Sequence, residues 1–149
     1  MDFPAVRDTV QDVIRAMWAT PPEAGLFPRG WWPSASCENV AVAVAAVLED
    51  RGHGQWTLVT AGRPGQISGH AWLEWRDETG CALFSIDPTL HQFEEWAAPF
   101  VGEGPTPAAV EFTELRWAGV IWDWPHLGTE TEIFQRLIRA VQEELRQSQ

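Results

Sequence analysis

Three residues of this chain have the types and the local contexts of one catalytic unit: Cys37, His70 and Asp87. Cys37 follows the polar stretch Ser-Ala-Ser and begins a helix-forming apolar run, which predicts a thiol at a helix N-terminus. Unpaired backbone N–H groups and the helix dipole favour the thiolate form at that position. A thiolate nucleophile, an imidazole base and a carboxylate that orients the base are the components of cysteine-dependent acyl transfer.

The spacing of the histidine and the aspartate predicts that they touch. Two short strands are expected at 69–76 and 81–87, on either side of the turn Asp-Glu-Thr-Gly. A two-residue loop in this turn would place His70 directly opposite Asp87, with Cβ atoms roughly 4.5–5.5 Å apart. A three-residue loop with Gly80 in a left-handed bulge would shift the pairing by one residue, so both registers stay open.

Around these residues the chain carries C-x-x-x-A at the start of the helix, H-A-W-L-E on one strand and D-P-T after the next. F-P-R-G precedes the helix, and Q-F follows at 92–93. This set resembles the bacterial transglutaminase-like superfamily, which has the papain-like fold and the chain order Cys, His, Asp. Members of that group often carry Gly and Cys immediately after F-P-x-G, whereas here residues 31–36 intervene. The entrance to the nucleophile is therefore expected to be reshaped.

The resemblance implies an α+β, papain-like fold in which a central helix carrying the cysteine packs on an antiparallel sheet and a C-terminal helix closes the domain. It implies an enzyme that acts on an amide bond through a thioester. A protease or a glutamine or asparagine deamidase is favoured over a transglutaminase or another amide-forming acyltransferase. A transferase must exclude water from the thioester with a specialised lid, and no segment of the sequence is identified as such a lid. The alternative is a catalytically silent papain-like binding protein that uses a Trp-rich loop and an acidic surface.

Hydrophobic periodicity supplies the elements that would position the triad. Helices are expected at 4–18, 37–50 and about 130–146, the second of them buried because it is apolar nearly all round. Thr129 and Glu132 form a capping-box pattern before the last helix. Further strands are expected near 55–61, 110–116 and 118–123, with a loop at 102–107. The whole of 1–149 is expected to be one domain.

The residues predicted on the substrate side of the site are Trp31, Trp32, Ser36 and Trp72. Ser36 also suits the N-cap of the central helix. The tryptophans either pack in the core and its rim, which Trp does in bulk, or line an aromatic channel, as the resemblance suggests. His91 and Gln92 follow D-P-T and could reach the rim of the site.

Composition limits the partners. The net charge is −11 and all ten basic residues are arginines, which argues against nucleic acid because phosphate contacts need clustered cations. The acidic balance favours a cationic or amine-bearing partner. The expected substrate is a peptide, a protein or a small amide.

Two cysteines and four histidines lack the spacing of a metal site, so no metal and no other cofactor is expected. Apolar stretches are too short to span a bilayer, so no membrane partner is expected. The N-terminal residues lack the pattern of a secretory signal. The default expectation is a cytoplasmic protein, with export by a dedicated secretion system left open.

Overall fold

The computed structural model describes residues 1–128 and 132–149. Over these residues the α+β class is confirmed, with a five-stranded antiparallel sheet and four α-helices. The helices are α1 (Phe3–Ala19), α2 (Cys37–Asp50), α3 (Ala108–Glu111) and α4 (Ile133–Gln147). The strands are β1 (Thr57–Gly62), β2 (Gly69–Arg76), β3 (Ala82–Asp87), β4 (Phe100–Glu103) and β5 (Glu114–Gly119).

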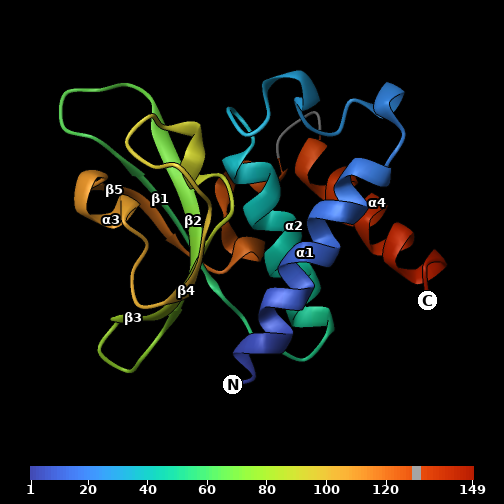
Figure 1. Ribbon diagram of the computed structural model, residues 1–149, viewed down its shortest axis with the longest axis horizontal. Helices are drawn as coiled ribbons and strands as arrows, with labels where there is room; N and C mark the ends of the chain where they lie inside the picture. The colour runs from blue at the N-terminus through green and yellow to red at the C-terminus, as the bar shows by residue number, and fades with distance from the viewer. Residues whose placement is uncertain (129–131) are drawn as a thin grey trace.

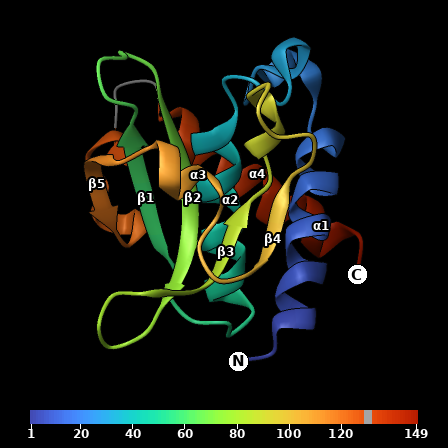
Figure 2. The ribbon, with the colours of Figure 1, turned by 60° about the vertical axis from the view of Figure 1, so that its left-hand side comes forward.

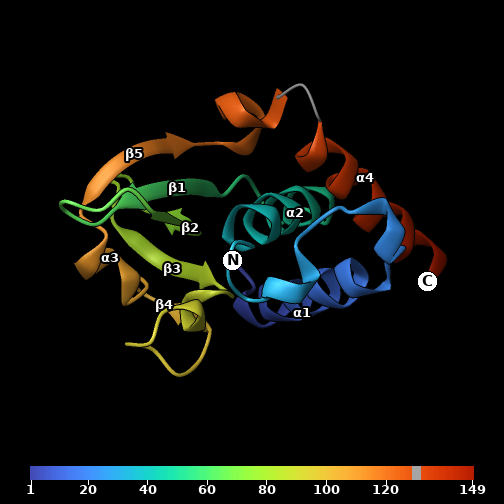
Figure 3. The same ribbon diagram turned by 90° about the horizontal axis from the view of Figure 1, so that it is seen from above.

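Helix α2 lies at the centre of the molecule, between the sheet and the pair formed by α1 and α4 (Figures 1 and 3). Every residue from Asn39 to Leu48 is buried, because the alanines and valines of this run leave no polar face. Helix α1 instead buries one side, including Val6, Val10 and Val13, and exposes the other. The layers therefore place the first turn of α2 beside the sheet.

The sheet has the order β4-β3-β2-β1-β5 and buries side chains on both faces. Leu58 and Leu73 belong to the core beneath the helices, whereas Val59 and Trp72 belong to a second cluster, since successive strand residues point to opposite faces. Phe112, next to α3, completes the second cluster, and Figure 2 shows α3 in front of the sheet.

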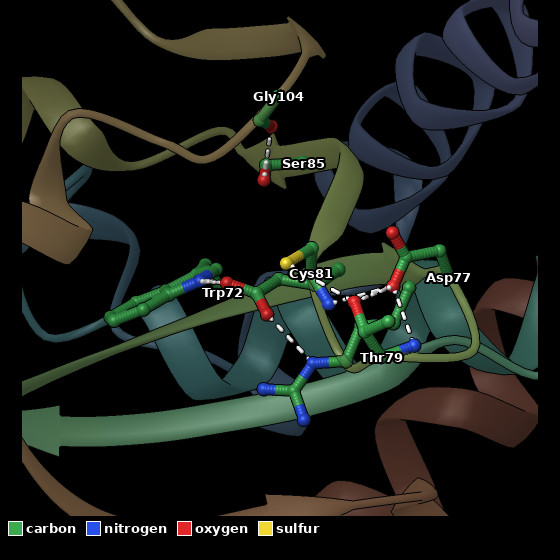
Figure 4. A network of polar contacts seen from close by, with 8 residues as sticks. Trp72, Asp77, Thr79, Cys81, Ser85 and Gly104 are labelled. Atoms are coloured by element: carbon green, nitrogen blue, oxygen red, sulfur yellow. Dashed lines mark hydrogen bonds and ion pairs between the residues drawn. The ribbon is translucent and has the colours of Figure 1, made fainter.

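The pairing of β2 with β3 differs from the predicted register. Leu73 pairs with Ile86, two positions further along the chain than predicted. The turn accounts for one residue of this register shift, because it is a three-residue loop with Gly80 at φ 89°. A 2.9 Å hydrogen bond from the Asp77 N–H to the Cys81 carbonyl closes the loop. The Asp77 carboxylate also accepts hydrogen bonds from Thr79 and the Cys81 N–H (Figure 4). The second position comes from a bulge in the β2–β3 ladder.

The central helix and β2 have the predicted bounds, and α1 and β1 lie within two residues of theirs. The strand pair predicted at 110–116 and 118–123 is wrong: only β5 forms there, followed by a 3-10 helix at Ile121–Asp123. Strand β4 and helix α3 were not predicted. The Thr129 cap and the predicted start of the last helix fall outside the described residues, and within those residues Glu132 precedes α4 and makes no side-chain capping bond.

Within the described part of the chain, none of the helices combines the length and the apolar character that crossing a membrane requires.

Candidate active site

Cys37 is the first residue of α2, as predicted, and its thiol is half-buried. Ser36 occupies the N-cap position, but its hydroxyl donates to the Ser34 carbonyl at 3.3 Å and caps nothing, so the predicted side-chain cap is wrong. The first helical hydrogen bond runs from the Val40 N–H to the Ser36 carbonyl. Among the described residues no acceptor binds the N–H groups of Cys37, Glu38 and Asn39. The start of α2 therefore offers free donors beside the thiol.

His70 and Asp87 form a buried pair. His70 Nε2 lies 2.7 Å from Asp87 Oδ1, and both side chains are fully excluded from solvent. The predicted contact is therefore confirmed, although the two residues are not directly opposed. Continuing the observed register places Asp87 across from Trp72, so His70 reaches the carboxylate diagonally, from two residues away on the same face.

A second donor fixes the carboxylate. The Thr106 hydroxyl donates to Asp87 Oδ2 at 2.7 Å, and it accepts a hydrogen bond from the Ala108 N–H at 3.3 Å. Both oxygens of Asp87 thus have a partner in a buried place. Loss of either donor would leave a buried carboxylate oxygen of Asp87 without a hydrogen bond, which costs free energy.

Aromatic rings surround the imidazole. The ring centroids of Phe93, Phe112 and Trp72 lie 5.0, 5.5 and 5.7 Å from that of His70. The remaining ring nitrogen, Nδ1, lies 3.2 Å from Gln92 Nε2. When His70 is neutral and donates to Asp87 through Nε2, Nδ1 can accept from this amide. When the ring is protonated, Nδ1 carries a hydrogen and no longer accepts from this amide.

The balance of these contacts favours the imidazolium. Burial lowers the pKa of His70, but hydrogen bonds to Asp87 and Cys37, together with the negative charges of these groups, outweigh it and raise the pKa from 6.5 to about 9. At neutral pH the ring therefore carries a proton next to the thiol. That arrangement matches the thiolate–imidazolium pair of activated cysteines.

A cavity of about 280 Å³ opens at Cys37 and His70. The sheet contributes residues of β1, β2 and β5, and the segment after β5 closes the other side. The remaining lining residues are Glu38, Thr60, Ala61, Gly69, Ala71, Arg116, Trp117, Trp124, Pro125 and His126. Cys37 and His70 thus share one pocket with two tryptophans, a carboxylate and a guanidinium group.

None of the four predicted substrate-side residues lines this cavity. Trp31 is 72% exposed, whereas Trp32 packs on Trp18 and Phe27. Ser36 and Trp72 are buried. The Trp72 indole N–H donates to the Glu74 carboxylate at 2.9 Å (Figure 4).

The aromatic wall comes instead from Trp117 and Trp124, which sequence reasoning did not single out. It also missed Thr106, which lies in a loop with no motif around it. These residues follow Cys37 by about 70 to 90 positions, and only the fold brings them back to it. The high Trp content of the chain indicates that some tryptophans could line the site, but the sequence does not show which of the ten do so.

Comparisons with family models, with curated proteins and with solved structures found no match for this chain. Within the described residues, no three His, Cys, Asp or Glu side chains gather as they would around a metal ion.

Proposed function

We propose that this protein is a cysteine-dependent acyl-transfer enzyme with a papain-like, transglutaminase-like fold. The observation that carries the proposal is the buried His70–Asp87 pair, whose imidazole faces a cysteine at the uncapped start of a central helix. Buried charged pairs also occur as structural elements. What favours catalysis here is that Cys37 and His70 open into the same cavity.

In the first step the Cys37 thiolate attacks the carbonyl carbon of an amide. The S–C bond forms and negative charge develops on the carbonyl oxygen. The unpaired backbone N–H groups of Cys37 and its neighbours would stabilise this oxyanion. The His70 imidazolium then gives its proton to the leaving nitrogen, the C–N bond breaks and a thioester remains.

In the second step a nucleophile resolves the thioester. Neutral His70 takes the proton of that nucleophile and returns to the imidazolium, while Asp87 keeps the ring oriented. Water as the nucleophile gives a protease or a deamidase, and an amine gives a transferase. Arg116 and His126 in the cavity wall are exposed to solvent, and this access of water supports a hydrolase over a transferase.

Thiol reactivity tests the proposal. The chain provides its own control, because Cys81 is exposed on the surface and Cys37 is only half-exposed. An unactivated pair would alkylate in the order of access, Cys81 first. An activated Cys37 reacts with iodoacetamide faster than Cys81 at pH 6, where ordinary thiols are protonated. Peptide mass mapping of the wild type, Cys37→Ala and Cys81→Ala separates the two rates.

Two results would contradict the proposal. The first is alkylation of Cys37 at pH 6 no faster than that of Cys81. The second is a Cys37 rate that does not change in His70→Ala, which would mean that the imidazole does not act on the thiol. Either result would favour the catalytically silent binding protein.

A further inference from the structure

The cavity carries two opposite charges that the proposed acyl transfer does not use. Glu38 follows the nucleophile directly and is half-buried, and Arg116 lies in the facing wall on β5. Among the described residues, neither forms an ion pair with any partner within 4 Å. Two charges held apart in one small pocket can each take a charged group of a ligand.

The backbone is shaped to place Arg116. Strand β5 bulges against β1: Thr60 pairs with Trp117 and Ala61 with Leu115, so that Arg116 is the extra residue between them. Bulges next to active sites redirect a side chain. This one directs the guanidinium group over a cross-strand pair of glycines, Gly62 and Gly69.

The two glycines form a shallow bed for the guanidinium group. A Cβ atom at Gly62 would lie 2.7 Å from Arg116 Nη2, and one at Gly69 would lie 2.5 Å from Nη1. Arg116 Nη2 also donates to the Ile67 carbonyl at 2.6 Å. The glycines and this hydrogen bond orient the side chain, while most of its five donors stay available for a planar anion such as a carboxylate.

Glu38 supplies the complementary charge. Burial raises the pKa of its carboxyl, and the charges of His126 and Arg116 lower it again, which shows that all three share one electrostatic environment. A purely anionic ligand would meet Arg116 but be repelled by Glu38. A ligand with an ammonium and a carboxylate group satisfies both.

We propose that the cavity binds the free α-ammonium and α-carboxylate groups of an amino-acid amide such as L-glutamine or L-asparagine, with Arg116 holding the carboxylate and Glu38 the ammonium. This inference rests on the proposed function, and it narrows the substrate from peptides to small amino-acid amides. Cys37 bonds the side-chain carbonyl carbon, the C–N bond breaks, and nitrogen leaves as ammonia with a proton from His70. Water then replaces the sulfur and gives the acid.

The size of the cavity agrees with this substrate. Its volume of about 280 Å³ falls just below the range of roughly 300–1,000 Å³ typical of pockets for drug-sized ligands. Trp117 and Trp124 in the lining supply apolar surface for the aliphatic part of the side chain.

Binding to Cys37→Ala protein, which cannot turn the ligand over, tests the inference by calorimetry. The probes are L-glutamine and L-asparagine, each also with an N-acetyl cap or an α-amide cap. We expect each cap to weaken binding about 10- to 100-fold, as loss of a hydrogen bond to a charged group does. Binding that is equal for free and capped forms, or no binding of either free amino acid at millimolar concentration, overturns the inference.

Charge-removing variants assign the two groups. Arg116→Gln should abolish the difference between the free acid and its α-amide, and Glu38→Gln the difference between the free amine and its N-acetyl form. Gly62→Ala keeps the charge but displaces the guanidinium group, and should weaken binding of the free acid only. The exposed residues Arg139 and Glu23 provide matched controls, since Arg139→Gln and Glu23→Gln lie outside the cavity lining. Selectivity unchanged in both cavity variants overturns the assignment.

The two proposals fail separately. If Cys37 alkylates rapidly at pH 6 but the protein binds free and capped amino acids equally well, only the amino-acid assignment is disproved. If Cys37 is unreactive but the protein still binds the free amino acids more tightly than the capped ones, the acyl-transfer proposal is disproved and the ligand-binding site is retained. Thermal unfolding of each variant shows whether a lost response reflects lost structure.

Discussion

The two sides of the candidate active site differ in how completely their polar groups are satisfied. On the base side, His70, Asp87 and Thr106 form a buried chain in which each carboxylate oxygen has a donor. On the thiol side, Cys37 is half-buried and the first N–H groups of α2 have no acceptor in the described part of the chain. His70 is held in one place by its buried partners, whereas the N–H groups beside Cys37 have no acceptor among the described residues.

This difference has a physical consequence. A buried network of hydrogen bonds fixes the orientation and the protonation of the imidazole, but leaves it little capacity for new partners. An uncapped helix start costs stability, which a Ser side chain could have recovered through a capping bond. Ser36 occupies that position and its hydroxyl turns away to Ser34. The unsatisfied side is where a substrate carbonyl would find its donors.

Removing the thiol tests the free side of the site and should have the largest effect. Cys37→Ala should lower turnover by at least about 10⁴-fold, because the nucleophile is lost, and should leave the free energy of unfolding nearly unchanged. Steady-state kinetics on any substrate of the wild type, together with urea unfolding, measures both. Turnover comparable to the wild type would show that Cys37 is not the nucleophile.

Removing a charge from the buried side should lower turnover more than it lowers the reactivity of the thiol. Asp87→Asn should lower kcat by up to about 10⁴-fold, because the amide stabilises the imidazolium less and can select the wrong tautomer. The loss can be smaller, since Asn fills this role in papain-like proteases. The alkylation rate of Cys37 should fall less than kcat. A variant with full kcat would mean that the buried pair is structural only.

The three central residues of the site could be predicted from local sequence, whereas the residues around them could not. The contexts of Cys37, His70 and Asp87 are local, and the central helix and β2 were predicted with the correct bounds. The His70–Asp87 contact was predicted from a register that is wrong by two residues. It survives because a shift of two keeps both side chains on one face, whereas a shift of one would have separated them.

The rest of the site depends on tertiary structure. Arg116 reaches the cavity through a bulge, and nothing in the local sequence signals a bulge at that position. The predicted strand at 118–123 is a 3-10 turn after Gly119, although its apolar residues suit a strand equally well. Strand β4 is short and lies at the edge of the sheet, where propensity is a weak guide.

The protonation of the buried side predicts a pH dependence of stability. The pKa of His70 is raised from 6.5 to about 9, so this group stabilises the fold fully below about pH 6.5. The contribution is lost as the pH rises through 9, with an upper limit of about 3 kcal/mol. Urea unfolding between pH 6 and 10 should show this decline in the wild type and not in His70→Asn. A wild-type curve parallel to that of the variant would contradict the raised pKa.

The smallest expected effect comes from the outermost member of the buried chain. Thr106→Val keeps the shape of the side chain but removes the donor to Asp87 Oδ2, which should cost roughly 1–3 kcal/mol of stability because a buried carboxylate oxygen is left without that partner. Turnover should fall about tenfold through kcat and not through KM, since 1.36 kcal/mol of transition-state stabilisation corresponds to that factor. Thr106→Ser keeps the hydroxyl and should restore both quantities. If Val and Ser behave alike, the hydroxyl does not position Asp87, and the base side is fixed by His70 and the surrounding rings alone.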